Sequence, residues 1–401
     1  MIFIKSSIFL LWLGAVLDPV GQMFGIRYLS IALSVASIIW LIGTCKINYT
    51  EKSHRSSLIL FIAGILPIHG LFIYSLHAGA SEFIDTSYIA AGLLIIFSLL
   101  YRDQDSCMYG VKALLLTVRF LSILIIVAYA SPILGHEAWI SFFTERSVAL
   151  VSFREYSGFN LPYVYFLASP LLILLIAHDF SKFRQTLNFR TCAIFALSSF
   201  SLFLTGTRAH IIISIFFIPI YMLLISSAKT IYKALLFVGV FFFMGLALED
   251  FWVLFGLFFS PSETSNSMKL SLLDGYMEIF SNPVYFIAGQ GFNAHEWSSD
   301  VRQMVSMEVG ASKTELTYLE LIRVFGVFVA AAFISTLLFF ARATKSLPRD
   351  FSWIYPGLVI YLANAAINPY LFSINGMLPL GLFSAISLYF RGSKLNIIRC
   401  N

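Results

Sequence analysis

A short run of small and polar residues around Arg208 is the clearest candidate for chemistry in the sequence. It reads Leu204-Thr205-Gly206-Thr207-Arg208-Ala209-His210 and separates two apolar segments, so it predicts a tight turn that ends at the arginine. A planar guanidinium binds a phosphate through two parallel hydrogen bonds, and the small neighbours leave room for a bulky anion. An arginine at a helix end can also simply extend its charge toward the membrane surface. Arg208 is therefore a phosphate-binding candidate with a structural alternative.

Three other arginines are candidates for binding an anionic substrate. Arg154 lies in Phe153-Arg154-Glu155-Tyr156, where an acidic neighbour can pair with it at the surface. Arg302 lies in a long polar stretch and has the same two interpretations. Arg323 follows Glu320 by three residues, which places both on one helix face where they can neutralise each other.

Glu315 and His295 are the candidates for proton transfer. Glu315 follows Thr314 at the start of an apolar segment, where a capping threonine and a carboxylate in the first turn both favour a helix. The same carboxylate can act as a general base toward a hydroxyl. His295 lies in a polar stretch and is the second candidate for this base, although a loop histidine is usually only solvated. The sequence contains no histidine pair at metal-binding spacing and no nucleotide-binding loop, so we expect neither a metal nor a cofactor.

The composition shows which kind of scaffold must position these residues. Of 401 residues, 59% are hydrophobic and only 12% are charged, and the mean hydropathy is +0.86. A soluble chain needs about twice this share of charged residues to cover its surface. Soluble, disordered and nucleic-acid-binding proteins are therefore excluded. The four cysteines are widely spaced and predict no disulfide framework.

The apolar segments predict an all-α polytopic membrane protein. A spanning helix needs about 20 apolar residues, and we find about twelve such segments, so residues 1–401 are expected to form a single helical bundle. No stretch shows clear alternation at strand period. The predicted spans are roughly 7–24, 28–45, 56–77, 84–101, 111–133, 160–178, 191–206, 208–227, 231–250, 315–341, 352–370 and 372–390.

Basic residues predict the orientation of this bundle. Most of the 26 lysines and arginines fall on one side, which is expected to be cytoplasmic and to hold both termini. The opposite side then carries an extracytoplasmic loop at 134–159 and a large one at 250–314. In the large loop, Leu270–Phe280 predicts an amphipathic helix that ends at Asn282-Pro283, and Gly289-Gln290-Gly291 predicts a turn. The candidate arginines, Glu315 and His295 would all belong to this outer side.

Three stretches, 204–210, 273–293 and 314–327, resemble the bacterial O-antigen polymerase and O-antigen ligase superfamily. The first is similar to the family's Ser/Gly-x-Ser/Thr-Arg element, and the second, with Pro283 before Gly289-Gln290-Gly291-Phe292, is similar to part of its large external loop. The third, which leads to Gly326, is similar to the entry into the next span. Glu315 stands where ligases carry histidine, and Val329 replaces a second glycine, so the resemblance favours a polymerase.

The resemblance implies a metal-independent, inverting glycosyltransferase of the bacterial inner membrane. Its donor would be an oligosaccharide on undecaprenyl diphosphate, and its acceptor a hydroxyl of another lipid-linked unit at the periplasmic face. Arg208 would match the family arginine that holds the diphosphate, and Arg154 would match a second one. Membrane lipid and a chain-length regulator are the expected partners. The alternatives are a ligase that transfers glycan to lipid A-core, and a non-enzymatic flippase of lipid-linked oligosaccharides.

Overall fold

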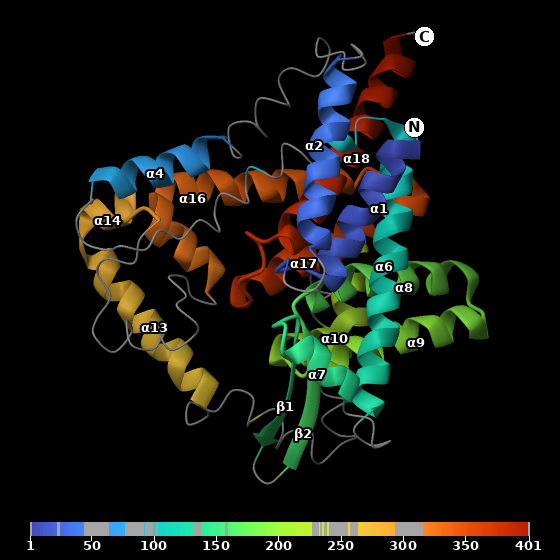
Figure 1. Ribbon diagram of the computed structural model, residues 1–401, viewed down its shortest axis with the longest axis horizontal. Coiled ribbons are helices and arrows are strands. Elements are labelled where there is room, and N and C mark those ends of the chain that lie inside the picture. The colour runs from blue at the N-terminus through green and yellow to red at the C-terminus, as the bar shows by residue number, and fades with distance from the viewer. Residues whose placement is uncertain are drawn as a thin grey trace. The chain divides into compact units, whose positions relative to one another are not determined.

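The computed structural model describes residues 2–21, 25–43, 64–76, 99–101, 103–131, 138–156, 159–226, 264–292 and 316–399, with a few isolated residues between them. The chain divides into two compact units, which Figure 1 shows together. The first comprises residues 1–117, 269–350 and 365–401, and the second comprises 118–268 and 351–364.

Helices dominate the described residues. In chain order they are α1 (Ile2–Leu17), α2 (Ile26–Gly43), α4 (Leu66–Leu76), α6 (Gln104–Ala130), α7 (Ala138–Thr144), α8 (Leu172–Thr186), α9 (Phe189–Leu204), α10 (Arg208–Ile225), α13 (Thr264–Ser281), α14 (Pro283–Ala288), α16 (Thr317–Thr344), α17 (Ile354–Asn364) and α18 (Ile374–Arg399). Short 3-10 turns occupy Ser169–Leu171, Arg349–Phe351 and Ala365–Ile367.

Within the described part, three helices are long and apolar enough to cross a membrane, namely α6, α10 and α16. This agrees with the predicted membrane protein and with the predicted spans at 111–133, 208–227 and 315–341. The predicted spans at 84–101 and 231–250 lie mostly outside the described residues. The bundle of about twelve spans therefore stays a prediction.

The predicted start of the sixth span, at residue 160, is wrong. Strands β1 (Ala149–Tyr156) and β2 (Phe159–Phe166) form an antiparallel hairpin there, with Ala149 opposite Phe166, and the all-α prediction is corrected to this extent. Aromatic and β-branched residues favour strands, and Pro162 would interrupt a helix. The regular helix α8 begins only at Leu172, after the turn that contains Pro170.

In the second unit, helices α8, α9 and α10 pack around an aromatic cluster, and α17 contacts α8 and α10. Phe180 of α8 lies edge-on to Tyr221 of α10, with ring centroids 4.9 Å apart, and also contacts Phe195 and Phe217. These rings hold α8, α9 and α10 together and thereby fix the turn between α9 and α10 that carries Arg208.

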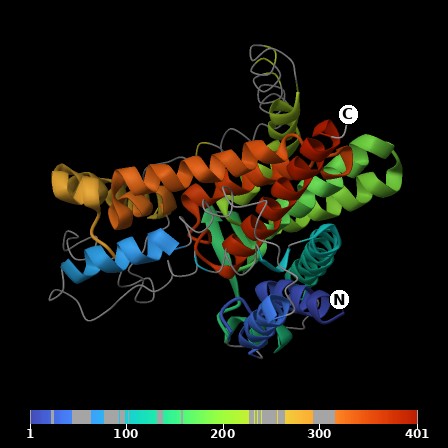
Figure 2. The same cartoon turned by 90° about the horizontal axis from the view of Figure 1, so that it is seen from above.

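In the first unit, α4 and α14 both contact α16, as the views in Figures 1 and 2 agree. A buried cluster of Leu272, Tyr276 and Ile279 joins α13 to this group by packing against Leu316 and Leu319 at the start of α16. The predicted amphipathic helix at 270–280 is confirmed, and Asn282 separates it from α14 by capping the next helix through its side chain.

Candidate functional site

The turn before α10 has the predicted tight geometry. Gly206 adopts a φ of +67°, and a Cβ there would lie 2.1 Å from the Tyr163 Cβ, so only glycine fits. Thr207 is the N-cap of α10, and its hydroxyl accepts a hydrogen bond from the His210 amide at 3.3 Å. Arg208 is therefore the first residue of a helix that can cross a membrane.

Arg208 combines a fixed positive charge with the positive end of the α10 dipole. Arg208 is half-buried as a whole, its Nε and Nη2 atoms are buried, and Nη1 donates a hydrogen bond to the side-chain oxygen of Asn266. A cation in the first turn of a helix is unfavourable by itself, whereas an anion beside it is stabilised by the guanidinium and by the helix end together. The geometry therefore suits a phosphate-bearing ligand.

His210 links the turn to α17 through hydrogen bonds of its two ring nitrogens. It is fully buried, its Nδ1 lies 2.8 Å from the Thr205 hydroxyl oxygen, and its Nε2 lies 3.3 Å from the Asn364 side-chain nitrogen. Because the Thr205 hydroxyl donates its hydrogen to the Leu202 carbonyl, it must accept from Nδ1–H, and Nε2 then accepts from Asn364. His210 is thus a neutral Nδ1–H tautomer that positions the turn, a role that the sequence did not reveal.

Arg323 and Glu320 form a buried ion pair in the first unit. Arg323 Nη2 donates to Glu320 Oε1 at 2.5 Å and Nε donates to Oε2 at 2.8 Å, with both side chains almost fully buried. The Tyr276 hydroxyl donates to the same Oε2 at 2.7 Å, and Gln290 Oε1 accepts from Arg323 Nη1 at 3.3 Å. The predicted pairing of Arg323 with Glu320 is confirmed, while its role in substrate binding stays a prediction.

Helix α16 is interrupted directly after this pair. Gly326 has non-helical angles, φ 76° and ψ 162°, which frees carbonyl groups of the preceding turn. Gln290 and Gly291 donate their backbone N–H groups to the carbonyls of Arg323 and Val324, at 2.6 and 3.0 Å. The predicted glycine turn at 289–291 is confirmed by positive φ angles at both glycines. Its N–H groups supply the hydrogen bonds that the carbonyls before Gly326 lose where the helix is broken.

His69 of α4 completes this arrangement. Its Nε2 lies 3.2 Å from the Ala288 carbonyl oxygen and 3.1 Å from the Phe325 carbonyl oxygen. Both partners are acceptors, so Nε2 must carry the proton. One histidine therefore links α4, α14 and the break in α16, all within the first unit.

Several predicted site residues cannot be placed from the described residues. Glu315, His295 and Arg302 lie outside them, and Arg154 is placed only by its backbone, opposite Leu161 in the hairpin. Arg208 belongs to the second unit and Arg323 to the first. Their roles in binding and catalysis stay predictions.

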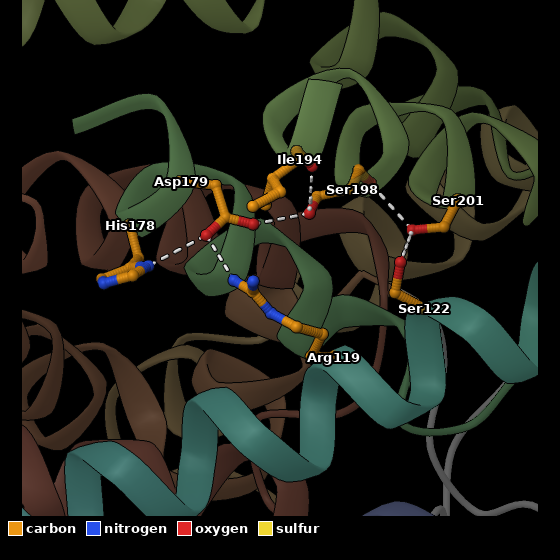
Figure 3. A network of polar contacts seen from close by, with 7 residues as sticks. All are labelled: Arg119, Ser122, His178, Asp179, Ile194, Ser198 and Ser201. Carbon is orange, nitrogen blue, oxygen red and sulfur yellow. Dashed lines mark hydrogen bonds and ion pairs between the residues drawn. The ribbon is translucent and has the colours of Figure 1, made fainter. Parts of the chain in front are cut away.

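A buried carboxylate on α8 is a polar centre that the sequence interpretation missed. Asp179 Oδ1 accepts hydrogen bonds from Arg119 Nη2 at 2.5 Å and from His178 Nδ1 at 3.0 Å, and Oδ2 accepts from the Ser198 hydroxyl at 2.6 Å (Figure 3). Asp179 is buried while Arg119, in the middle of α6, is partly exposed. The carboxylate thus supplies the counter-charge that an arginine in a spanning helix requires.

Replacing one member of the Glu320–Arg323 pair is expected to lower the stability of the protein severely. Replacing both members is expected to lower it only mildly. Arg323→Met leaves a buried carboxylate without its counter-charge, which costs about 3–5 kcal/mol. Adding Glu320→Gln removes that charge and keeps an acceptor for the Tyr276 hydroxyl, so most of the stability should return. The unfolding midpoint of the purified protein measures both effects. Equal midpoints for the wild type and Arg323→Met would contradict a structural role of this pair.

The sequence matches no family model and no curated protein.

Proposed function

We propose that this protein is a repeat-unit polymerase of the O-antigen type, which joins lipid-linked oligosaccharides at the periplasmic face of the bacterial inner membrane. The observation that carries the proposal is Arg208, a half-buried arginine at the first position of α10. Both the guanidinium and the helix N-terminus favour the diphosphate of a lipid carrier. The three apolar helices support a substrate that is itself anchored in the membrane.

The proposed reaction needs little chemistry from the protein. An acceptor hydroxyl attacks the anomeric carbon of the donor glycan, the bond from this carbon to the diphosphate oxygen breaks, and the configuration inverts. Charge grows on the departing lipid diphosphate, where Arg208 is placed to stabilise it. Glu315, with His295 as the second candidate, takes the proton of the acceptor hydroxyl. Arg154, Arg302 and Arg323 are the further candidates for holding anionic substrate.

A strain that lacks this protein tests the proposal. Lipopolysaccharide that carries a single repeat unit is expected, because the ligase would still transfer unpolymerised units. Bare core with accumulated lipid-linked polymer would instead identify a ligase. Bare core without such polymer would identify a flippase, and elongation of lipid-linked glycan by the purified protein alone would exclude that outcome.

A further inference from the structure

The exposed side of α13 is divided into two chemically different flanks. Leu270, Leu273 and Met277 are exposed and, at about 100° per residue, lie within an arc of about 60°. Asp274 and Glu278 are also exposed and lie about 40° and 80° beyond Leu270 on the same helix. We call these the apolar flank and the acidic flank of α13.

The opposite side of α13 is occupied by the protein itself. Leu272, Tyr276 and Ile279 are buried against Leu316 and Leu319, so the helix cannot rotate to hide its apolar flank. Met277 is 69% exposed, which is unusual for a large apolar side chain in water. One helix thus has three sides, namely one buried in the protein, one exposed and apolar, and one exposed and acidic.

The short helix α14 also carries exposed apolar side chains and lies next to the apolar part of α16. Val284 and Ile287 of α14 are 60% and 52% exposed. A Cβ at Gly326 would lie 2.0 Å from the Ile287 carbonyl oxygen, so α14 touches α16 at its break. Beyond this break, residues 327–341 of α16 contain no charged residue, so α14 lies where the apolar part of α16 begins.

Helix α4 also contacts α16 and is itself apolar. Its His69 binds the Ala288 carbonyl of α14, and its exposed side chains include Ile68, Phe72 and Leu76. On α16, Phe328 is exposed two residues after the break. Exposed apolar side chains therefore occur on each of α4, α13, α14 and α16, and α16 is long and apolar enough to cross a membrane.

We propose that α13 and α14 lie in the interface of the bilayer, with Leu270, Leu273 and Met277 among the acyl chains and Asp274 and Glu278 in water. An amphipathic helix buries its apolar side about 5–10 Å into the boundary between headgroups and acyl chains. On this proposal, the described part of the predicted extracytoplasmic loop, residues 264–292, rests on the membrane and does not project from it. The inference does not depend on the proposed glycosyl transfer.

Two adjacent positions of α13 form a matched pair for the test. A nitroxide spin label is attached to Met277→Cys or Glu278→Cys, in a chain whose four native cysteines are replaced by serine, and each protein is reconstituted into phospholipid vesicles. Collision rates with oxygen, which concentrates in the bilayer, and with a water-soluble nickel chelate are measured by electron paramagnetic resonance. Leu273→Cys and Asp274→Cys repeat the comparison one turn earlier.

The ratio of oxygen to nickel collisions is expected to be several-fold higher at 277 than at 278, and at 273 than at 274. Nickel collisions that dominate at all four positions would overturn the proposal, because the apolar flank would then face water. Immobile labels at 273 and 277 that neither reagent reaches would also overturn it, because protein would then cover this flank. Since the vesicles contain no glycan, a negative result for α13 leaves the polymerase proposal standing. Failure of the polymerase proposal likewise leaves the placement of α13 and α14 in the interface standing.

Discussion

Replacement of Arg208 by alanine is expected to abolish long polysaccharide chains while leaving a normal amount of protein in the membrane. On the proposed function, the guanidinium stabilises the negative charge that grows on the departing diphosphate, and losing one such group typically lowers a rate about 10²–10³-fold. Arg208→Lys keeps the charge but cannot form two parallel hydrogen bonds, so an intermediate loss is expected. Chain length is read from lipopolysaccharide gels beside a blot of the protein.

Arg190 provides a matched control for this experiment. It lies in the first turn of α9, behind the N-cap Asn188, as Arg208 lies in the first turn of α10 behind Thr207. Arg190 is exposed and falls on the predicted cytoplasmic side, so Arg190→Ala should retain wild-type chains. Unchanged long chains in Arg208→Ala at normal protein level would refute the proposed role of Arg208.

Gly326→Ala is expected to prevent folding of the first unit. The residue has a φ of +76°, and an added Cβ would lie 2.0 Å from the Ile287 carbonyl oxygen and 2.6 Å from its carbon. These are backbone atoms, so the clash can be relieved only by moving α14 away from α16. We expect a loss of more than about 4 kcal/mol, which is a large share of the roughly 5–15 kcal/mol that typically separates a folded protein from its unfolded state.

Two other glycines distinguish the cost of a positive φ from the cost of a steric clash of the added Cβ. Gly25 has a φ of +64° with open space around the added Cβ, so Gly25→Ala should cost only about 1–2 kcal/mol of backbone strain. Gly64 has open space without a positive φ, so Gly64→Ala should be neutral. The unfolding midpoint and the yield of monodisperse protein rank the three variants. Equal stability of Gly326→Ala and Gly64→Ala would show that the break in α16 is not required.

Local signals made part of the structure predictable. The short run of small and polar residues before Arg208 indicated the turn, and the spacing of Glu320 and Arg323 indicated their pairing. These features depend on neighbours within one helical turn, where periodicity and capping act directly. The asparagine and proline at 282–283 likewise marked the boundary between α13 and α14.

The remaining features depend on contacts between distant segments. Asp179 directly follows the predicted span at 160–178 and was not singled out, because its partner Arg119 lies on another helix 60 residues away. Gln290 looked like part of a simple turn, because only the break at Gly326 creates carbonyls for its backbone to bind. The hairpin at 149–166 was missed because its apolar second strand resembles the start of a spanning helix.

The pairing of Arg119 with Asp179 also has a consequence for the order of events during biosynthesis. The two residues are 60 positions apart, so the arginine leaves the ribosome well before its counter-charge has been made. At roughly 5–20 residues per second, this interval lasts about 3–12 s. On the predicted membrane topology, α6 then enters the insertion machinery with a positive charge that only water, headgroups or the machinery itself can accommodate. A ribosome that stalls before residue 179 therefore leaves a nascent chain whose α6 lacks the carboxylate that would hold it in the bilayer.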